Sequence, residues 1–279
     1  MGEPLLRPVP VAEARAGMEQ RLAAAARAYE RTPLDADSII WLGRRTAYLG
    51  RFNEAIAIYT RGIAKHPGDA RLYRHRGHRY LTIRHLDKAT ADFQKAATLI
   101  AGMPDQVEPD GLPNARNIPT STLNSNIRYH LGLAHYLKSE FDSAARIYAG
   151  DVAQSANPDM LVASSHWLYM SLRRLGRTKE AEAVLDKISR DMPIIENGTY
   201  HRLLLMYKGE LVPADLLPDS GGVAASLDNV TAAYGVANWH LYNGRPADAE
   251  RIFREILVRR TQWASFGYLA AEAELARKR

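Results

Sequence analysis

The sequence contains no cysteine among its 279 residues. Disulfides, thiolate nucleophiles and thiolate zinc sites are therefore excluded. No apolar run approaches the roughly 18 residues that a membrane-spanning helix needs, so we expect no transmembrane segment. The first residues also lack the apolar core of a secretory signal peptide. None of these absences identifies the cellular compartment, because exported proteins without cysteine are common.

The motifs of several enzyme classes are also missing. The sequence has no H-E-x-x-H, no G-x-S-x-G and neither of the glycine-rich phosphate-binding patterns. His75 and His78 lie three residues apart, and His130 and His135 five apart, but a histidine metal site usually adds a carboxylate on the same face. We therefore expect no catalytic residues, no bound metal and no cofactor.

Basic residues exceed acidic ones by 37 to 31, which gives a net charge of +6. Only 8 of the basic residues are lysine, so arginine dominates. Arginine binds carboxylates and phosphates in a bidentate manner, although its abundance also follows genomic base composition. The net charge is modest for this length, and Asp37, Asp87 and Asp92 interrupt the basic runs. Nucleic acid is therefore not the expected partner.

An internal repeat organises the chain. Small or aromatic residues recur in pairs. Three pairs are 34 residues apart, namely Gly43 and Gly77, Ala55 and Ala89, and Tyr59 and Phe93. Two further pairs are 68 residues apart, which is twice that interval, namely Gly176 and Gly244, and Ala181 and Ala249. Each unit contains two apolar stripes at helical spacing, separated by a short polar turn. A single helical hairpin cannot bury its own stripe, so successive hairpins must stack.

The stretch 41–69, WLGRRTAYLGRFNEAIAIYTRGIAKHPGD, resembles the tetratricopeptide repeat. The matching residues are Leu42, Gly43, Ala55, Tyr59 and Pro67. The repeat interval of about 34 residues also equals the length of that repeat. This resemblance implies an all-α, right-handed α-solenoid of about five helical hairpins with capping helices.

Segments such as RLYRHRGHRY (71–80) are also similar to a bacterial group of such proteins with no settled function. Members of that group often carry an export signal. The resemblance therefore favours a periplasmic or exported location, and a cytoplasmic one stays open.

The predicted organisation is one solenoid domain over residues 1–279. Its parts are an N-terminal cap (1–35), repeats at 36–69, 70–103, 125–158, 162–195 and 230–263, a degenerate repeat (196–229) and a C-terminal capping helix (264–279). Residues 101–124 break the phase with proline, glycine and asparagine and are predicted to form an inserted loop. Loops of this length are often functional, and a flexible linker is the alternative.

The resemblance also implies that the first helix of each repeat lines a concave groove. In residues 71–80, Arg71, Arg74, His75 and His78 fall on one helical stripe at i, i+3, i+4 and i+7. Arg76 and Arg79 lie off this stripe and are expected to be structural, and we expect Arg76 to pair with an acid of an adjoining helix.

The predicted groove is basic, aromatic and rich in amides. Its residues are Trp41, Arg44, Arg71, Arg74, His75, His78, Asn126, Tyr129, His130, His166, Trp167, Met170, Arg173, Tyr234 and Asn238, with Tyr136 and Arg174 at neighbouring groove positions. The candidate residues of a loop lid are Asn114, Arg116, Thr120 and Thr122.

Such a groove favours a non-catalytic protein–protein interaction module that binds an acidic or extended peptide. The alternative is a small-molecule or catalytic groove that uses His78, His130 and His166 under the 101–124 loop, since histidine titrates near neutral pH. Packing between successive helices is the structural alternative for each of these rings.

Overall fold

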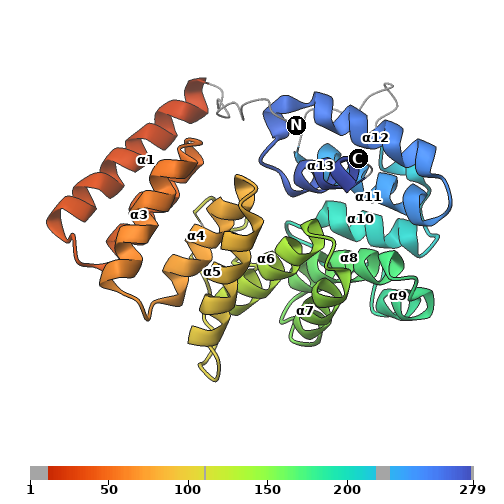
Figure 1. Cartoon of the computed structure of the whole chain (residues 1–279), viewed down its shortest axis with the longest axis horizontal. Coiled ribbons are helices and arrows are strands. Elements are labelled where there is room, and N and C mark those ends of the chain that lie inside the picture. Colours follow the sequence, from red (N-terminus) through yellow and green to blue (C-terminus); the bar gives the residue numbers. More distant parts are fainter. Residues whose placement is uncertain (1–11, 110, 218–226, 278–279) are drawn as a thin grey trace. The chain divides into compact units, whose positions relative to one another are not determined.

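The computed structural model describes residues 12–109, 111–217 and 227–277 (Figure 1). These residues form thirteen α-helices and two short 3₁₀ helices. Within the described ranges there is no strand, only one isolated antiparallel bridge between Val107 and Thr122. The prediction of an all-α fold is therefore confirmed. Helix-to-helix contacts divide the chain into two compact units, Met1–Gln106 (unit 1) and Val107–Arg279 (unit 2).

Unit 1 contains one single helix and two hairpins. The helices are α1 (Ala12–Arg31), α2 (Ala36–Tyr48), α3 (Phe52–Lys65), α4 (Ala70–Thr82) and α5 (Leu86–Leu99). The hairpins α2/α3 and α4/α5 match the repeats predicted at 36–69 and 70–103. The single helix α1 lies where the sequence predicts the N-terminal cap.

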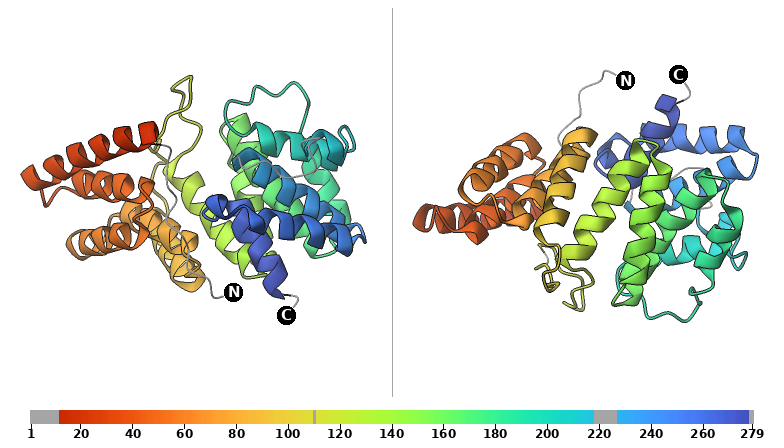
Figure 2. Two further views of the ribbon diagram at one scale, coloured as in Figure 1. Left: turned by 90° about the horizontal axis from the view of Figure 1, so that it is seen from above. Right: turned by 60° about the horizontal axis from the view of Figure 1, so that its bottom comes forward.

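Unit 2 contains three hairpins and two single helices (Figure 2). The hairpins are α6/α7 (Leu123–Leu137, Phe141–Ala153), α8/α9 (Pro158–Arg174, Thr178–Leu185) and α11/α12 (Leu227–Tyr242, Pro246–Val258). The single helices are α10 (Gly198–Tyr207) and α13 (Phe266–Arg277), and the 3₁₀ helices are Pro213–Asp215 and Arg260–Gln262. In the degenerate repeat only α10 and the first 3₁₀ helix precede residues 218–226, which lie outside the described residues. A single continuous solenoid domain stays a prediction.

Helix boundaries follow local signals that recur with the repeat. Asp35 and Asp69, one repeat interval apart, cap α2 and α4 by accepting the backbone N–H of Ser38 and Arg71. The first helix of each hairpin is followed by a residue with positive φ. These residues are Gly50 (72°), Arg84 (66°), Ser139 (67°), Gly176 (73°) and Gly244 (76°). Glycine adopts this backbone region without strain, whereas Arg84 and Ser139 do so at a cost.

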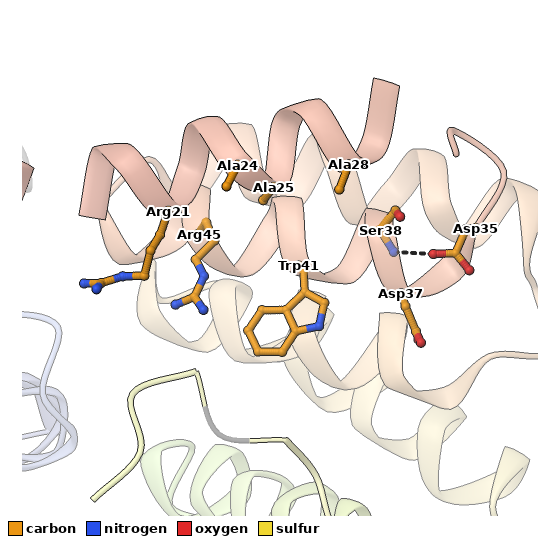
Figure 3. A pocket seen from close by; sticks show the side chains of 9 residues that line it. All are labelled: Arg21, Ala24, Ala25, Ala28, Asp35, Asp37, Ser38, Trp41 and Arg45. Carbon is orange, nitrogen blue, oxygen red and sulfur yellow. Dashed lines mark hydrogen bonds between the residues drawn. The ribbon is translucent and has the colours of Figure 1, made fainter. Parts of the chain in front are cut away.

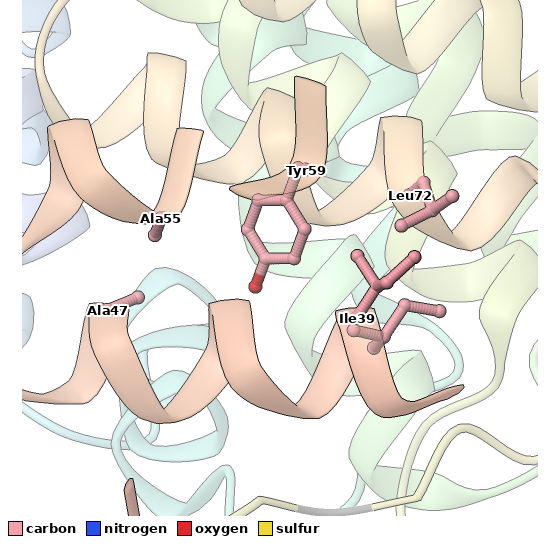
Figure 4. Close-up of a cluster of buried hydrophobic side chains, with 6 residues drawn as sticks. Ile39, Ala47, Ala55, Tyr59 and Leu72 are labelled. Carbon is pink, nitrogen blue, oxygen red and sulfur yellow. The ribbon is translucent and has the colours of Figure 1, made fainter. Parts of the chain in front are cut away.

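A glycine beneath an aromatic ring brings the two helices of a hairpin close together. A Cβ atom at Gly43 would lie 2.4 Å from the Tyr59 ring, and one at Gly132 would lie 2.6 Å from the Tyr148 ring. The ring therefore fills the space that a side chain would need, and the hairpin closes around it. Figure 4 shows the resulting buried cluster in unit 1, which consists of Ile39, Ile40, Ala47, Ala55, Tyr59 and Leu72.

Candidate functional site

Arginine side chains surround a tryptophan on α2 in unit 1. The guanidinium carbons of Arg44 and Arg45 lie 4.4 and 4.8 Å from the centre of the half-buried Trp41 ring. Both distances permit cation–π attraction. Burial lowers the pKa of Arg45, and the charges of Arg21 and Arg44 lower it further. Like charges therefore gather around this ring.

The neighbouring helix α4 adds further basic groups. His75 is buried and stacks on Tyr59, with ring centres 5.7 Å apart. The Arg74 guanidinium donates to His75 Nδ1 at 3.0 Å. Burial lowers the pKa of Arg79 to about 10, and the charges of Arg74 and Arg44 contribute to that shift. His78 lies half-buried on the same helix. We call Trp41, Arg44, Arg74, His78 and Arg79 the basic face of unit 1.

Two other arginines of α4 form ion pairs within unit 1. Arg76 holds Asp92 of α5 through two hydrogen bonds of 2.8 and 2.7 Å, which confirms the predicted pairing with an acid of an adjoining helix. Arg71, a predicted groove residue, lies 2.6 Å from Asp69 and 2.5 Å from Asp37. The hydrogen bond from Arg71 to Asp69 raises the Arg71 pKa beyond its usual range. The charge of Arg71 is thus shared between two carboxylates of its own unit.

A pocket of about 340 Å³ opens between α1 and α2 (Figure 3). We call it the α1–α2 pocket. It is lined by Arg21, Ala24, Ala25, Ala28, Asp35, Asp37, Ser38, Trp41 and Arg45. Arg21 and Arg45 lie at one end of the pocket, and Asp35 and Asp37 lie at the other. Only Trp41 among these residues was a sequence-predicted site residue.

Most of the predicted groove residues of unit 2 lie in its interior, and Asn126, Tyr129 and Arg173 are half-buried. Trp167 is 1% exposed and Asn238 is 0% exposed, and Met170 and Tyr234 are equally buried. Trp167 Nε1 donates to the Tyr129 hydroxyl at 2.8 Å. The family resemblance predicts a concave surface for these side chains, whereas in the structure they form a hydrogen-bonded aromatic core.

The C-terminal helix α13 explains much of this burial, because it packs against α6 and α11 (Figure 2). Glu274 of α13 is 4% exposed and lies 2.5 Å from the guanidinium groups of Arg174 and Arg277. The Tyr234 hydroxyl oxygen lies 3.4 Å from the same carboxylate. At the other end of α13, the Phe266 ring contacts the rings of Tyr129 and His130. An acidic side chain was expected to come from a partner, but in unit 2 the chain's own Glu274 takes this place.

Tyr136 links three of the helices in this core. Its hydroxyl accepts hydrogen bonds from Tyr234 and Asn238 of α11, each at 2.9 Å. Its backbone carbonyl accepts from Arg277 of α13 at 3.1 Å. These contacts use the amide and phenol groups that the sequence analysis assigns to ligand recognition.

Comparisons with known proteins agree with this architecture. Among solved structures, the chain is similar to a tetratricopeptide repeat protein from Parabacteroides merdae, with a TM-score of 0.53 and 12% identity over 92% of this chain and 94% of that chain. The chain has the tetratricopeptide-repeat fold. It is also similar to YrrB, a tetratricopeptide protein with an unusual peptide-binding site, with a TM-score of 0.48 and 16% identity over 92% of this chain and 98% of that chain. No protein-family model matches the chain, and no curated protein matches it in sequence.

The three histidines of the alternative hypothesis lie in different environments of this tetratricopeptide fold. His166 is buried between Tyr200 and Tyr207, and burial lowers its pKa to about 3. It is therefore neutral at physiological pH. His130 Nδ1 donates to the Asn126 carbonyl at 2.6 Å. His78 belongs to unit 1. Among the described residues, no group of three histidine or acidic side chains is placed to hold a metal.

Two predicted groove residues remain. Asn126 Nδ2 donates to Glu108 at 2.9 Å. Arg173 of α8 contacts side chains of α8 and of the end of α11 and the segment after it. Its guanidinium donates to the Tyr169 hydroxyl and to Asn243 Oδ1, both at 3.0 Å. It also lies 4.5 Å from the centre of the Tyr242 ring. Arg173 therefore contributes to packing between α8 and the end of α11.

The predicted loop contacts the segment before α10 and leads into the N-terminal end of α6. Asn114 Nδ2 donates to Glu196 at 3.0 Å, and the Thr120 hydroxyl donates to the other oxygen of that carboxylate. Thr122 caps α6, and the backbone N–H of Arg116 donates to Asn114 Oδ1 while its side chain stays exposed. Closure of this loop over a ligand stays a prediction.

Asp159, which the sequence analysis missed, positions the segment that holds the loop. Its buried carboxylate accepts the backbone N–H groups of Ile195, Glu196 and Asn197 at 2.8–2.9 Å. An acid after Pro158 in the first turn of a helix is an ordinary helix-start signal, so the sequence gives no sign of this second role.

Among the described residues, no helix has the length and apolar character needed to cross a membrane.

Proposed function

We propose that this protein is a non-catalytic interaction module that binds an acidic, extended peptide segment on the basic face of unit 1. The observation that carries the proposal is the gathering of guanidinium groups around Trp41 and His75. Arg44 lowers the pKa of both Arg45 and Arg79, so these like charges interact unfavourably with one another. A partner carboxylate among them replaces repulsion with charge-assisted hydrogen bonds.

The aromatic component supports an extended peptide as the ligand. Trp41 keeps part of its ring exposed between two arginines. Aromatic rings and arginine together are the groups that most often dominate the free energy of protein–protein binding. The carboxylate of an acidic peptide binds the guanidinium groups, while an adjacent apolar side chain packs on the indole.

Unit 2 supports this choice of ligand through its internal contacts. There, Arg174 and Tyr234 of the first helices contact Glu274, which is an acidic side chain of the chain's own α13. Arginines of the basic face in unit 1 are proposed to bind an acid from a partner in a similar way. Since α13 already covers the equivalent side chains of unit 2, unit 1 is the favoured site for a partner.

The test measures the binding of fluorescein-labelled acidic peptides by the full chain. Each peptide is paired with a counterpart in which Asn and Gln replace Asp and Glu. The double variant Arg44→Ala/His78→Ala removes two half-buried groups of the basic face. A hydrogen bond to a charged group contributes about 1.5–3 kcal/mol, so we expect binding to weaken by about tenfold or more.

Arg61→Ala is the matched control, because Arg61 is an exposed arginine on α3 outside the basic face. It should leave peptide binding unchanged. Equal binding of the acidic peptides and their amide counterparts would refute the proposal. So would an equal loss of affinity in the control variant.

A further inference from the structure

The α1–α2 pocket occupies a repeat-equivalent position that a helix fills elsewhere in unit 1. A shift of one repeat interval relates the pocket residues of α1 to residues of α3: Arg21 to Ala55, Ala24 to Ile58, Ala25 to Tyr59 and Ala28 to Gly62. The same shift relates the pocket residues of α2 to residues of α4: Ser38 to Leu72, Trp41 to His75 and Arg45 to Arg79. One repeat later, the corresponding position against α3 and α4 is occupied by α2.

Contacts of α2 show what this position requires of its occupant. Gly43 of α2 lies directly under the Tyr59 ring, and Ile39 packs beside Gly62 together with Leu72. Asp37, at the start of α2, pairs with Arg71 of α4. A helix in this position thus buries an apolar stripe and forms an ion pair near its N-terminus.

We propose that the α1–α2 pocket binds an amphipathic helix of a partner protein, in the position that α2 holds against α3 and α4. Within residues 12–109 no helix stands in that position before α1, and the 340 Å³ pocket remains there. The pocket shares Trp41 and Arg45 with the proposed peptide site, whereas Arg44, Arg74, His78 and Arg79 lie outside its lining.

Side chains of the pocket define the chemistry of this helix. Ala25 stands where α3 has Tyr59, so the partner can place a large apolar side chain where α2 has Gly43. Asp37 stands where α4 has Arg71, and its carboxylate is 65% exposed, so it favours a basic residue near the start of the partner helix.

The opposite end of the pocket favours an acid. Arg21 and Arg45 lie there, and Ser38 and Arg45 are seven residues apart on α2, which corresponds to about 10 Å along a helix. The partner helix therefore carries its basic residue near its N-terminus and its acidic residue about two to three turns later.

The chain's own first residues are poorly suited to this role. Pro4, Pro8 and Pro10 fall within the sequence before α1. Each proline inside a helix removes a backbone hydrogen bond and costs about 3 kcal/mol. The partner helix is therefore expected to lack interior proline.

The experiment uses a designed peptide without tryptophan, of about 16 residues, which is long enough for an isolated helix to form. In a background of Ala and Gln it carries Lys, Leu, Phe and Glu at the places equivalent to Asp37, Ile39, Gly43 and Ala47 of α2. The control peptide exchanges Lys and Glu. Because an acid at the N-terminus and a base at the C-terminus stabilise a helix, the control is intrinsically the better helix. Tighter binding of the first peptide must therefore come from the pocket.

Calorimetry with the full chain is expected to show at least tenfold tighter binding of the first peptide. Ala25→Tyr, which copies Tyr59 into the pocket, should abolish this binding. Ala23→Tyr is the matched control, because Ala23 is exposed on α1 but does not line the pocket, and it should bind normally. Arg21→Glu should reduce the preference for the first peptide, because only Arg45 then remains to pair with the Glu of that peptide.

Several results would overturn the inference. These are absence of binding, unchanged binding by Ala25→Tyr, or equal affinity for the two peptides. If a chain that starts at residue 12 binds tenfold tighter, the chain's own N-terminal segment is the occupant instead. If Ala25→Tyr dissociates a dimer of the free protein, the occupant is a second copy. The double variant Arg44→Ala/His78→Ala should still bind the designed helix. A negative result for the acidic-peptide site is therefore distinguishable from a negative result for the pocket.

Discussion

Gly132→Ala tests whether the glycine beneath the aromatic ring is required for the close approach of α6 and α7. The added Cβ would lie 2.6 Å from Tyr148 Cζ and 2.8 Å from Cε2, well inside ordinary contact distance. Tyr148 is fully buried, and its hydroxyl donates to the Tyr129 carbonyl at 3.0 Å. The ring therefore cannot yield without disturbing its own hydrogen bond and its neighbours.

Three contributions set the magnitude of the effect. Alanine stabilises a helix interior by about 1 kcal/mol relative to glycine. Overpacking a well-packed interior costs about 1–3 kcal/mol, and losing the Tyr148 hydrogen bond costs about 1 kcal/mol more. The free energy of unfolding should therefore fall by about 1–3 kcal/mol, although alanine is the better helix former.

Gly150→Ala provides the matched control on α7, because a Cβ there meets nothing within 4 Å. It should raise the free energy of unfolding by up to about 1 kcal/mol. Urea unfolding followed by tryptophan fluorescence measures both variants, since the buried Trp167 ring stacks on Tyr148 with centres 6.5 Å apart. If the free energy of unfolding of Gly132→Ala equalled that of Gly150→Ala, the packing argument would be refuted. In the background Tyr148→Leu, Gly132→Ala should lose most of its cost.

Three further predictions concern unit 2. Glu274→Gln leaves the Arg174 guanidinium largely buried without its carboxylate, so urea unfolding should show a loss of about 3 kcal/mol that an added Arg174→Met change partly restores. Because burial lowers the folded-state pKa of His166 to about 3, only the unfolded imidazole takes up a proton between pH 7 and pH 5. The wild type should therefore lose about 2 kcal/mol over that range through this residue, a loss absent from a pH series of His166→Phe. Ser139→Gly should raise the melting temperature slightly, because Ser139 has a φ of 67°, whereas Gly176→Ala at the equivalent turn should lower it.

The fold was predictable because its signals are local and repeated. Proline before a helix, an aspartate cap, and a small residue facing an aromatic ring all recur from one repeat to the next. Each acts within one hairpin, so the pattern of one repeat predicts the next. The sequence also indicated that residues 196–229 depart from the pattern, and there α10 is followed by a 3₁₀ helix in the described residues.

The burial of the candidate site was not predictable in the same way. Trp41 and Trp167 share the sixth position of their repeats, yet Trp41 is half-buried and Trp167 is 1% exposed. The difference comes from what lies opposite each ring. For unit 2 this includes α13, whose Arg277 reaches the carbonyl of Tyr136 from 141 residues away in sequence. A periodic pattern contains no information about such a distant contact.

The residue types of a ligand groove and of a buried helix interface are also the same. Arginine and tyrosine bind a partner's carboxylate by the same kinds of hydrogen bond that hold Glu274 in place. The contact of α13 with Arg174 and Tyr234 is thus an intramolecular instance of the recognition proposed for the basic face of unit 1. In unit 2 the chain contains both the receptor and the acidic helix. In unit 1, Arg44 lies close enough to Arg45 and Arg79 to lower the pKa of each, and this repulsion is what a partner's carboxylate would relieve.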